Sequence, residues 1–581
     1  MSTYYTDERN AQILIALMKA HGIKRVIASP GGTNIGVVAS LQHDPFFELY
    51  SCVDERSAAY MACGMAAESG EAVALSCTGA TAARNYVPGL TEAFYRKLPV
   101  LAITSSRPNS QIGHHIAQVT DRRSPMPDIV RKSVHIPIVK DQEDEWECVT
   151  KINDAILELK HHGGGPVHIN VMTTYSTDFS VKDLPTVRVM HRISHNDPLP
   201  ALPKGQIAIF VGSHSPWTER LTKAVDAFCE TYNAAVLCDQ TSNYQGKYRI
   251  DAFLVACQMQ YHPDCCSPKI MIHIGEISGA YMTIKPQKTW RVSPDGVLRD
   301  TFKTLEYVFE MEELKFFEKY LVRTDSSEKR TSYFENWSAE YDRLATKIPE
   351  LPFSNLWIAQ QTASYLPENA VLHLGILSSL RAWNFFKIPE GISCYSNTGG
   401  FGIDGNTSTL LGASLVHSDK IYFGVVGDLS FFYDMNSIGN RHLGKNFRLM
   451  LINNGLGVEF MTNGVAKTAG MGEDTYPYVA AKGHFGNKSK EFVRHLAEDL
   501  GFEYLSASNK EEYLKILPRF TQVETTEKPM ILEVFTEDAL ENEALEIMRN
   551  LETTAAGTVK QLAKNILGDK GVQAVKKILN K

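Results

Sequence analysis

Three polar residues stand where two short apolar segments of this 581-residue chain end. Asp428 follows segment 421–426 after a single glycine, and Asn453 and Asn454 directly follow segment 448–452. A helical stretch separates the two segments, so we expect a strand, a crossover helix and a parallel strand whose carboxyl ends lie side by side. Carboxylate and amide oxygens beside a helix N-terminus suit a hard cation that carries a diphosphate. The sequence therefore predicts a Mg²⁺–diphosphate site and leaves open which asparagine is the ligand.

Each half of this pattern also has a purely structural explanation. A Gly-Asp pair can cap a helix, and Asn-Asn-Gly can form a turn. The two asparagines follow Asp428 by 25 and 26 residues, which is the length of one helical crossover between parallel strands. The combination at this spacing favours the metal site.

The pattern resembles the cofactor fingerprint of thiamin-diphosphate-dependent enzymes, in which Gly-Asp is followed one crossover later by Asn-Asn. By this resemblance, Asp428 and Asn454 are the side-chain ligands of Mg²⁺, and the carbonyl of Leu456 completes the shell. The resemblance also implies a carboxylate from another α/β domain beside the aminopyrimidine ring of the cofactor, and Glu55 matches that position. A carboxylate in the first turn of a helix is favourable by itself, so Glu55 also has a structural explanation.

Further segments resemble one branch of these enzymes, the 2-succinyl-5-enolpyruvyl-6-hydroxy-3-cyclohexene-1-carboxylate synthases of the menaquinone pathway. The similar segments span most of residues 10–540 and include Ser29-Pro30-Gly31-Gly32, Thr78-Gly79-Ala80-Thr81 and Gly402-Ile403-Asp404-Gly405. By this resemblance, Ile403 is the apolar wedge that bends the cofactor, and Leu429 and Ser430 meet its diphosphate. The cofactor-binding residues that the resemblance implies are Thr78, Gly79, Asn397, Ile403, Gly427, Leu429 and Ser430.

The chain departs from that branch where the synthases place arginines for carboxylate-rich substrates. Thr33 and Thr398 stand at two of those positions. Each lost guanidinium would forfeit charge-assisted hydrogen bonds of about 1.5–3 kcal/mol, so we expect a different substrate. The candidate substrate-binding residues are Thr33, Asn34, Arg107, Gln118 and Arg381.

A second departure resembles the pyruvate decarboxylase-type enzymes, which handle protons with paired histidines and a glutamate. His114 and His115 follow the predicted strand 100–105, and Glu459 follows the Asn-Asn-Gly turn. Histidine titrates near neutral pH, so these side chains are candidate acids or bases. The acidic residue that those enzymes carry after the Pro-Gly turn is replaced by Gly32. Solvated loop histidines and a surface carboxylate remain the alternative interpretation.

These resemblances predict a thiamin-diphosphate- and Mg²⁺-dependent lyase or transferase. The enzyme would decarboxylate a 2-oxo acid through a C2 ylid and an enamine, and then protonate the enamine or ligate it to an acceptor. One alternative is a carboligase of the branch above or of the acetolactate synthase type. An alternative from another class is a non-catalytic relative that acts through its C-terminal tail. The family also implies a homodimer or homotetramer with active sites between subunits.

The elements that must position these residues alternate between short apolar segments and helical patterns, which indicates βαβ units. We predict three doubly wound α/β domains with parallel sheets, followed by a helical tail. Their boundaries are 1–190 for the pyrimidine-binding domain, 200–330 for the middle domain, 350–540 for the diphosphate- and Mg²⁺-binding domain, and 541–581 for the tail. A Pro-rich linker at 198–203 separates the first two.

The composition excludes several classes of protein. Hydrophobic residues make up 44% and charged residues 22% of the chain, as in folded globular proteins. The net charge of −7 provides no basic field for nucleic acid or anionic lipid. Ten cysteines occur without CxxC spacing, and neither a signal-peptide pattern nor a membrane-spanning run is recognised. We expect a cytoplasmic protein with small-molecule substrates and without nucleic-acid or membrane partners.

Overall fold

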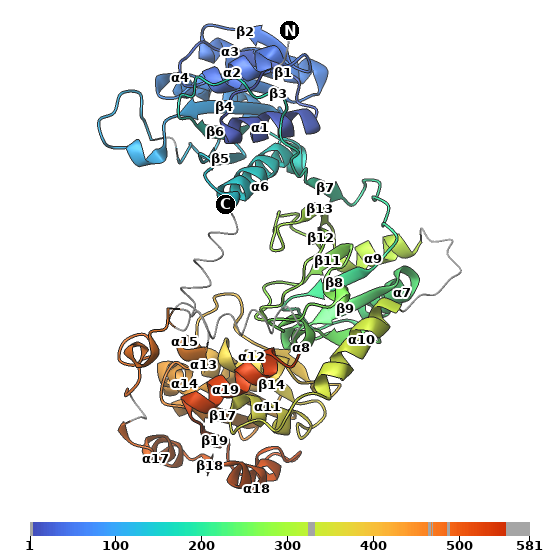
Figure 1. The fold of residues 1–581 in the computed structure, drawn as a ribbon, viewed down its shortest axis with the longest axis vertical. Coiled ribbons are helices and arrows are strands. Elements are labelled where there is room, and N and C mark those ends of the chain that lie inside the picture. Colours follow the sequence, from blue (N-terminus) through green and yellow to red (C-terminus); the bar gives the residue numbers. More distant parts are fainter. Residues whose placement is uncertain are drawn as a thin grey trace, which may run out of the picture. The chain divides into compact units, whose positions relative to one another are not determined.

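The computed structural model describes residues 4–121, 123–322, 332–462, 466, 469–484 and 488–552. The chain forms two compact units. One holds the chain up to Asp197 together with Gly296–Val308, and the other holds Pro198–Asp295 and the chain from Phe309 onward. Three predominantly parallel sheets with flanking helices make up these units (Figure 1), which confirms the predicted fold class.

The first unit is built on a six-stranded sheet of order β2-β1-β3-β4-β6-β5, in which every neighbouring pair is parallel. Its strands are β1 (Arg25–Ala28), β2 (Glu48–Ser51), β3 (Val73–Thr78), β4 (Val100–Ser106), β5 (Lys132–Ile136) and β6 (Val167–Met172). Its helices are α1 (Arg9–Ala20), α2 (Ile35–His43), α3 (Glu55–Ser69), α4 (Thr81–Asn85), α5 (Val87–Tyr95) and α6 (Gln142–Glu158).

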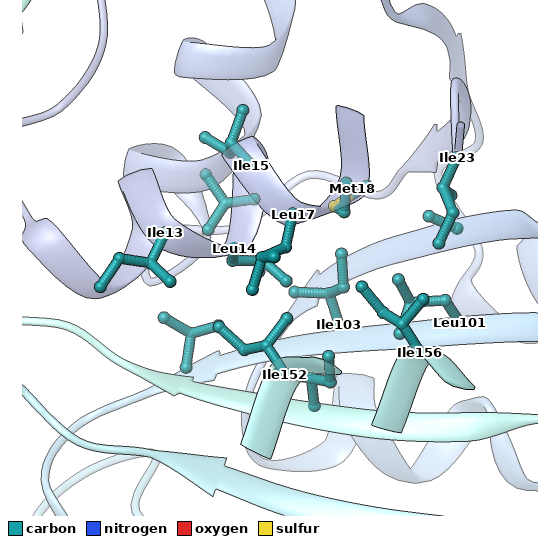
Figure 2. Close-up of a cluster of buried hydrophobic side chains, with 14 of the residues drawn as sticks. Ile13, Leu14, Ile15, Leu17, Met18, Ile23, Leu101, Ile103, Ile152 and Ile156 are labelled. Atoms are coloured by element: carbon teal, nitrogen blue, oxygen red, sulfur yellow. The ribbon is translucent and has the colours of Figure 1, made fainter. Parts of the chain in front are cut away.

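Side-chain alternation along the strands gives this sheet two apolar faces. Leu101 and Ile103 of β4 pack with α1 and α6 (Figure 2), whereas Ala102 between them belongs to the cluster with α3 and α5. On that second face the helices approach closely, because a Cβ at Gly89 of α5 would lie only 2.4 Å from the Cβ of Ala59 in α3. A sheet that is buried on both faces explains the nearly continuous apolar strands of the sequence.

The second unit contains two sheets. In the middle sheet, parallel strands run in the order β10-β9-β8-β11-β12. They are β8 (Ile207–Val211), β9 (Ala234–Cys238), β10 (Arg249–Asp251), β11 (Ile270–Ile274) and β12 (Lys288–Val292), with helices α7 (Glu219–Tyr232), α8 (Phe253–Ala256), α9 (Glu313–Leu321) and α10 (Ser332–Ala345). Elsewhere, β7 (His191–Ser194) and β13 (Leu305–Glu310) are neighbouring strands.

The third sheet carries the predicted metal site. Its parallel strands run in the order β15-β14-β16-β17-β19-β18. They are β14 (Val371–Leu374), β15 (Ser393–Tyr395), β16 (Tyr422–Gly427), β17 (Phe447–Asn453), β18 (Glu503–Ala507) and β19 (Met530–Phe535). The helices are α11 (Asn355–Ala363), α12 (Ser378–Asn384), α13 (Asn406–Ser414), α14 (Asp428–Asp434), α15 (Glu459–Thr462), α17 (Phe492–Asp499), α18 (Lys510–Phe520) and α19 (Asp538–Arg549).

The predicted tail begins within helix α19. Ala544, Leu545 and Met548 of α19 are buried, and α19 packs against α11 and α15. The rest of the tail from residue 553, and the polar stretch 323–330, lie outside the described residues. Across the described ranges, no helix is both long enough and apolar enough to cross a membrane.

Candidate active site

The two strands that carry the predicted metal ligands are neighbours in the third sheet. Gly427 at the end of β16 pairs with Ile452 of β17, so Asp428 and Asn453 come next to each other at the carboxyl edge. Asp428 is the first residue of α14 and is 2% exposed. Its Oδ1 accepts a hydrogen bond of 2.9 Å from the backbone N–H of Leu429. Its Oδ2 is buried and has no hydrogen-bond partner among the described residues.

The structure distinguishes the two asparagines that the spacing could not. The Nδ2 of Asn453 donates to Glu533 Oε1 on β19 over 2.7 Å, so this side chain is held between two strands. The Oδ1 of Asn454 is buried and lacks a partner within the described part of the chain. Asn454 therefore has the oxygen that can serve a cation, as the family resemblance implies.

The electrostatics of this edge fit a divalent cation. Burial raises the pKa of Asp428 to about 7, although the N–H groups of Leu429 and Gly455 oppose the shift. A cation would stabilise the charged form and satisfy the oxygens of both Asp428 and Asn454 that are otherwise unused. The carbonyl of Leu456 accepts from Val458 N–H at 2.9 Å and keeps a second lone pair for a ligand. These oxygen donors suit Mg²⁺.

The loop before α13 is tied to the beginning of α14. Ser430 Oγ and Asn406 Nδ2 both donate to the carbonyl of Ile403, over 2.6 and 2.8 Å. Asn406 Nδ2 also donates to Ser430 Oγ at 2.9 Å. Ile403 is thereby held beside the helix that begins with Asp428. Asn397, from the same set of expected cofactor-binding residues, donates to Thr409 Oγ1 at 3.2 Å.

Asn406 has a positioning role that the sequence analysis did not assign. Its amide binds the Ile403 carbonyl and the Ser430 hydroxyl, and both residues belong to the predicted cofactor-binding set. Gly405 precedes it with a φ of 75°, a left-handed conformation that glycine adopts without strain. The Gly-Asn pair at the start of a helical pattern is the signal that could have indicated this residue.

Arg381 and Glu459 contact each other. The Nη1 and Nη2 atoms of Arg381 donate to the two carboxylate oxygens of Glu459 over 2.6 and 2.8 Å. Ser378 Oγ donates to the same carboxylate over 3.3 Å. The resemblances imply substrate binding for Arg381 and proton transfer for Glu459, and their spacing in the sequence does not predict this ion pair.

Glu55 is the first residue of α3 in the first unit. Its Oε2 accepts from Asn85 Nδ2 over 3.3 Å. The neighbouring Asp54 already caps the helix, because its carboxylate accepts from Ser57 N–H over 2.8 Å. Glu55 is thus not needed as the helix cap.

The buried Thr33 and the half-buried Thr78 form a hydroxyl pair at the end of β3. Thr33 Oγ1 is hydrogen bonded to Thr78 Oγ1 and donates to the carbonyl of Ser105 over 2.6 Å. The N–H of Gly79 donates to Thr33 Oγ1 at 3.4 Å. A Cβ at Gly31 would lie 2.7 Å from the Cβ of Thr78, so glycine is needed for this approach. Thr33 therefore contacts both Thr78 and Gly79, two of the predicted cofactor-binding residues.

Asn34 lies next to this pair and is also buried. Its Nδ2 donates to the carbonyl of Ser29 over 3.0 Å, and its Oδ1 is buried without a hydrogen-bond partner in the described structure. Thr33 and Asn34, two of the candidate substrate-binding residues, are therefore both buried polar residues.

The remaining candidates lie in an irregular segment after β4. The imidazoles of His114 and His115 and the side chain of Gln118 are exposed. His115 and Gln118 have φ values of 56° and 64°. The guanidinium of Arg107 lies over the ring of Tyr175, 5.0 Å from its centroid. The structure does not bring these side chains together into a hydrogen-bonded site.

The fold and the predicted metal site agree with one class, the thiamin-diphosphate-dependent enzymes. Residues 9–125 match the family described as thiamine pyrophosphate enzyme, N-terminal TPP binding domain. The chain is also similar over nearly its whole length to curated proteins named 2-succinyl-5-enolpyruvyl-6-hydroxy-3-cyclohexene-1-carboxylate synthase. It belongs to the thiamin-diphosphate enzyme family, in the branch of these synthases.

Three of these relatives show the extent of the similarity. The synthase of Bacteroides fragilis is 32% identical over 556 residues, covering 92% of this chain and 97% of the relative. The synthase of Bacteroides thetaiotaomicron is 33% identical over 551 residues, covering 92% and 96%. The synthase of Flavobacterium johnsoniae is 28% identical over 555 residues, covering 90% and 96%. The similarity therefore covers both units of the structure.

Proposed function

We propose that this thiamin-diphosphate-dependent enzyme decarboxylates a 2-oxo acid and transfers the remaining acyl group to an acceptor. Mg²⁺ would hold the diphosphate of the cofactor. The observation that carries the proposal is the pair of buried, unused oxygens at the end of two neighbouring strands, Asp428 Oδ2 and Asn454 Oδ1. A buried oxygen without a partner is costly, and a bound cation removes that cost.

The residues of the chain have separate tasks in this proposal. Asp428, Asn454 and the carbonyl of Leu456 would hold Mg²⁺ on the diphosphate of the cofactor. Glu55 would hold a proton at its carboxyl group against the aminopyrimidine ring, with Asn85 orienting the carboxylate. When bound, thiamin diphosphate supplies the electron sink that permits loss of CO₂ from a 2-oxo acid.

Acyl transfer is favoured over release of an aldehyde by two observations. The similar curated proteins are named as synthases. Glu459, the candidate acid for protonation, has both carboxylate oxygens bound to Arg381. His114 and His115 remain as candidate proton donors, so aldehyde release is the outcome that would argue for a decarboxylase.

The second candidate is the synthase reaction named for the relatives. Identity of 32–33% over 92% of the chain favours it. The threonines at positions 33 and 398 and the paired state of Arg381 favour another substrate, because all three are buried and Thr33 and Arg381 already bind protein groups. Formation of 2-succinyl-5-enolpyruvyl-6-hydroxy-3-cyclohexene-1-carboxylate by the purified enzyme would establish this second candidate.

We further propose a homodimer or homotetramer in the cytoplasm, with Glu55 of one subunit serving the metal site of another. The family resemblance supports this assembly. Apolar side chains exposed on and beside α3 also support it: Val53 is 77%, Tyr60 48% and Met61 40% exposed in the single chain. Analytical ultracentrifugation with and without cofactor tests the assembly, and a fully active monomer would contradict it.

The reaction is tested by CO₂ release from pyruvate, 2-oxoglutarate, phosphonopyruvate, sulfopyruvate and branched-chain 2-oxo acids, with and without aldehyde acceptors. We expect release from at least one acid that requires both thiamin diphosphate and Mg²⁺, and more ligated product than free aldehyde when an acceptor is present. If the cofactor binds by calorimetry but no acid releases CO₂, decarboxylation is wrong. If only aldehyde forms with every acceptor, acyl transfer is wrong.

A further inference from the structure

The ion pair between Arg381 and Glu459 is arranged as arginine binds a ligand carboxylate. Two parallel N–H···O bonds of 2.6 and 2.8 Å join the guanidinium to both oxygens of the carboxylate. The two side chains are only 8% and 20% exposed. Parallel bidentate pairing uses the in-plane N–H donors of the guanidinium, which would otherwise recognise a carboxylate of a substrate. Glu459 therefore occupies the place that a substrate carboxylate could take.

The pair lies at the same sheet edge as the metal ligands. Arg381 is on α12, which follows the carboxyl end of β14 and packs against β14 and β16, the strand that leads to Asp428. Glu459 begins α15 five residues after Asn454. A Cβ at Gly279 would lie 2.3 Å from Leu380 Cδ2 and 3.3 Å from Thr398 Cγ2, so Thr398 lies close to α12 as well.

The space beside the pair is too small for a second carboxylate. A cavity of about 20 Å³ is lined by Ser378, Arg381, Val458 and Thr462, among others. This volume holds about one water molecule. Glu541 also lines the cavity, but its oxygens accept from Asn355 N–H at 3.0 and 3.1 Å, so it is not placed to replace Glu459.

A second arginine lies near the pair. Arg549 interacts electrostatically with Arg381, Glu459 and Glu546. Removing the charge of Glu459 would make this part of the sheet edge more positive. Such a charge attracts an anionic ligand, and it does so strongly where water is excluded.

We propose that Glu459 is a specificity-determining residue. It occupies the N–H donors of the Arg381 guanidinium, so that the enzyme selects 2-oxo acids with one carboxylate over 2-oxo acids with two. The inference rests on the proposed function for its reaction. It goes further by naming the substrate class and the residue that excludes the other class. Thr33 and Thr398, at positions where the branch was expected to carry arginines, agree with a monocarboxylate substrate.

The test compares 2-oxopentanoate with 2-oxoglutarate, two five-carbon acids that differ in the second carboxylate. We expect the wild-type holoenzyme to prefer 2-oxopentanoate by at least about tenfold in kcat/KM, and Glu459→Gln to shift this ratio towards 2-oxoglutarate by about tenfold or more. Glu473→Gln, on an exposed turn, is the matched control and should keep the wild-type ratio. An unchanged ratio in folded Glu459→Gln would overturn the proposal, as would a wild-type preference for 2-oxoglutarate.

A double variant covers the case in which Glu459→Gln does not fold, because it leaves a buried arginine without its partner. Arg381→Met with Glu459→Leu removes both charges, and we expect it to retain the wild-type preference ratio whatever its absolute rate. A shift of this double variant towards 2-oxoglutarate would contradict the proposal.

A binding measurement separates this proposal from the proposed reaction. Calorimetry with glutarate and pentanoate uses no turnover and is done on protein loaded with thiamin diphosphate and Mg²⁺. We expect Glu459→Gln to bind glutarate at least about tenfold more tightly than the wild type does, with pentanoate binding unchanged. This result would support the role of Glu459 even if no 2-oxo acid were decarboxylated. Equal glutarate affinities would overturn it even if decarboxylation were established.

Discussion

Two groups of candidate residues differ in how the fold holds them. Glu55, Asp428 and Glu459 are acids that each occupy the first position of a helix. Each has a side-chain or backbone hydrogen-bond donor next to its carboxylate. His114 and His115 lie in an irregular, exposed segment. The helix-start acids are oriented by one chain alone, whereas the loop histidines are not.

The difference has a physical cause. At the junction of a strand and a helix, the backbone is fixed on both sides, and the helix N-terminus favours negative charge. In an exposed loop, nothing in the chain offsets the entropy lost when a side chain adopts one conformation. Changes to the helix-start acids should therefore have larger effects than changes to the loop histidines.

The largest effect is expected from Glu55→Gln. The amide cannot exchange a proton with the aminopyrimidine ring, so kcat should fall by about 10²–10⁴-fold. Cofactor affinity should change little, because the shape of the side chain is kept. Steady-state kinetics and calorimetry measure the two quantities. Glu68→Gln, exposed near the other end of α3, is the control and should behave as wild type. Full turnover by Glu55→Gln would remove this residue from the mechanism.

The next largest effect is expected from Asp428→Asn. Removing one charged partner from a buried charge pair costs about 3–5 kcal/mol, so the affinity for thiamin diphosphate with Mg²⁺ should fall by more than about 100-fold. Calorimetry at several Mg²⁺ concentrations measures this loss. Asp499→Asn, exposed at the end of α17, should bind the cofactor as the wild type does. Equal affinities for Asp428→Asn and wild type would contradict the assigned metal site.

A smaller effect is expected at Glu541, a buried acid whose carboxylate accepts from Asn355 N–H and Thr536 Oγ1. Burial raises its pKa to about 7 from 4.5, so the folded state retains a proton that the unfolded state loses between these pH values. Folding stability should therefore decrease as pH rises from 5 to 8, by about 3 kcal/mol at most from this group.

Glu541→Gln should remove the contribution of this one group to the pH dependence. Urea unfolding at pH 5 and pH 8 would then show a smaller stability loss for the variant than for the wild type. Glu543→Gln, exposed on the same helix, should keep the wild-type slope. Identical pH dependence in the Glu541 variant and the wild type would show that Glu541 titrates normally.

The smallest effect is expected from His114→Ala with His115→Ala. Both side chains are exposed, so the free energy of unfolding should change by less than about 0.5 kcal/mol. The ratio of ligated product to aldehyde should change by less than about tenfold, because the proposed transfer does not need these imidazoles. Product analysis measures the ratio, with His43→Ala as the control. A loss of aldehyde of more than about tenfold would assign a proton-transfer role to His114 and His115. These loop residues would then matter as much for the reaction as the helix-start acids.

The buried elements were predictable, and several exposed ones were not. The predicted bounds agree within one or two residues with β4, β16 and β17 for the segments 100–105, 421–426 and 448–452. Apolar side chains on both faces are typical of a central parallel strand, so these strands can be recognised in the sequence. No strand is predicted at β5, β15 or β18, which lie at edges of the first and third sheets. Edge strands are partly solvated, so their sequences lack a continuous apolar signal.

By itself, the sequence determined the three α/β domains, the cofactor family and the residues that could hold Mg²⁺, because local patterns record which segments are buried and which motif ends each strand. Only the tertiary structure decided how these residues are paired. Asn453 is bound to Glu533 of β19, 80 residues away, which leaves Asn454 as the ligand of the proposed metal site. Arg381 is bound to Glu459, 78 residues away. Such pairings arise from the folding of distant segments onto one sheet edge, and no local spacing records them.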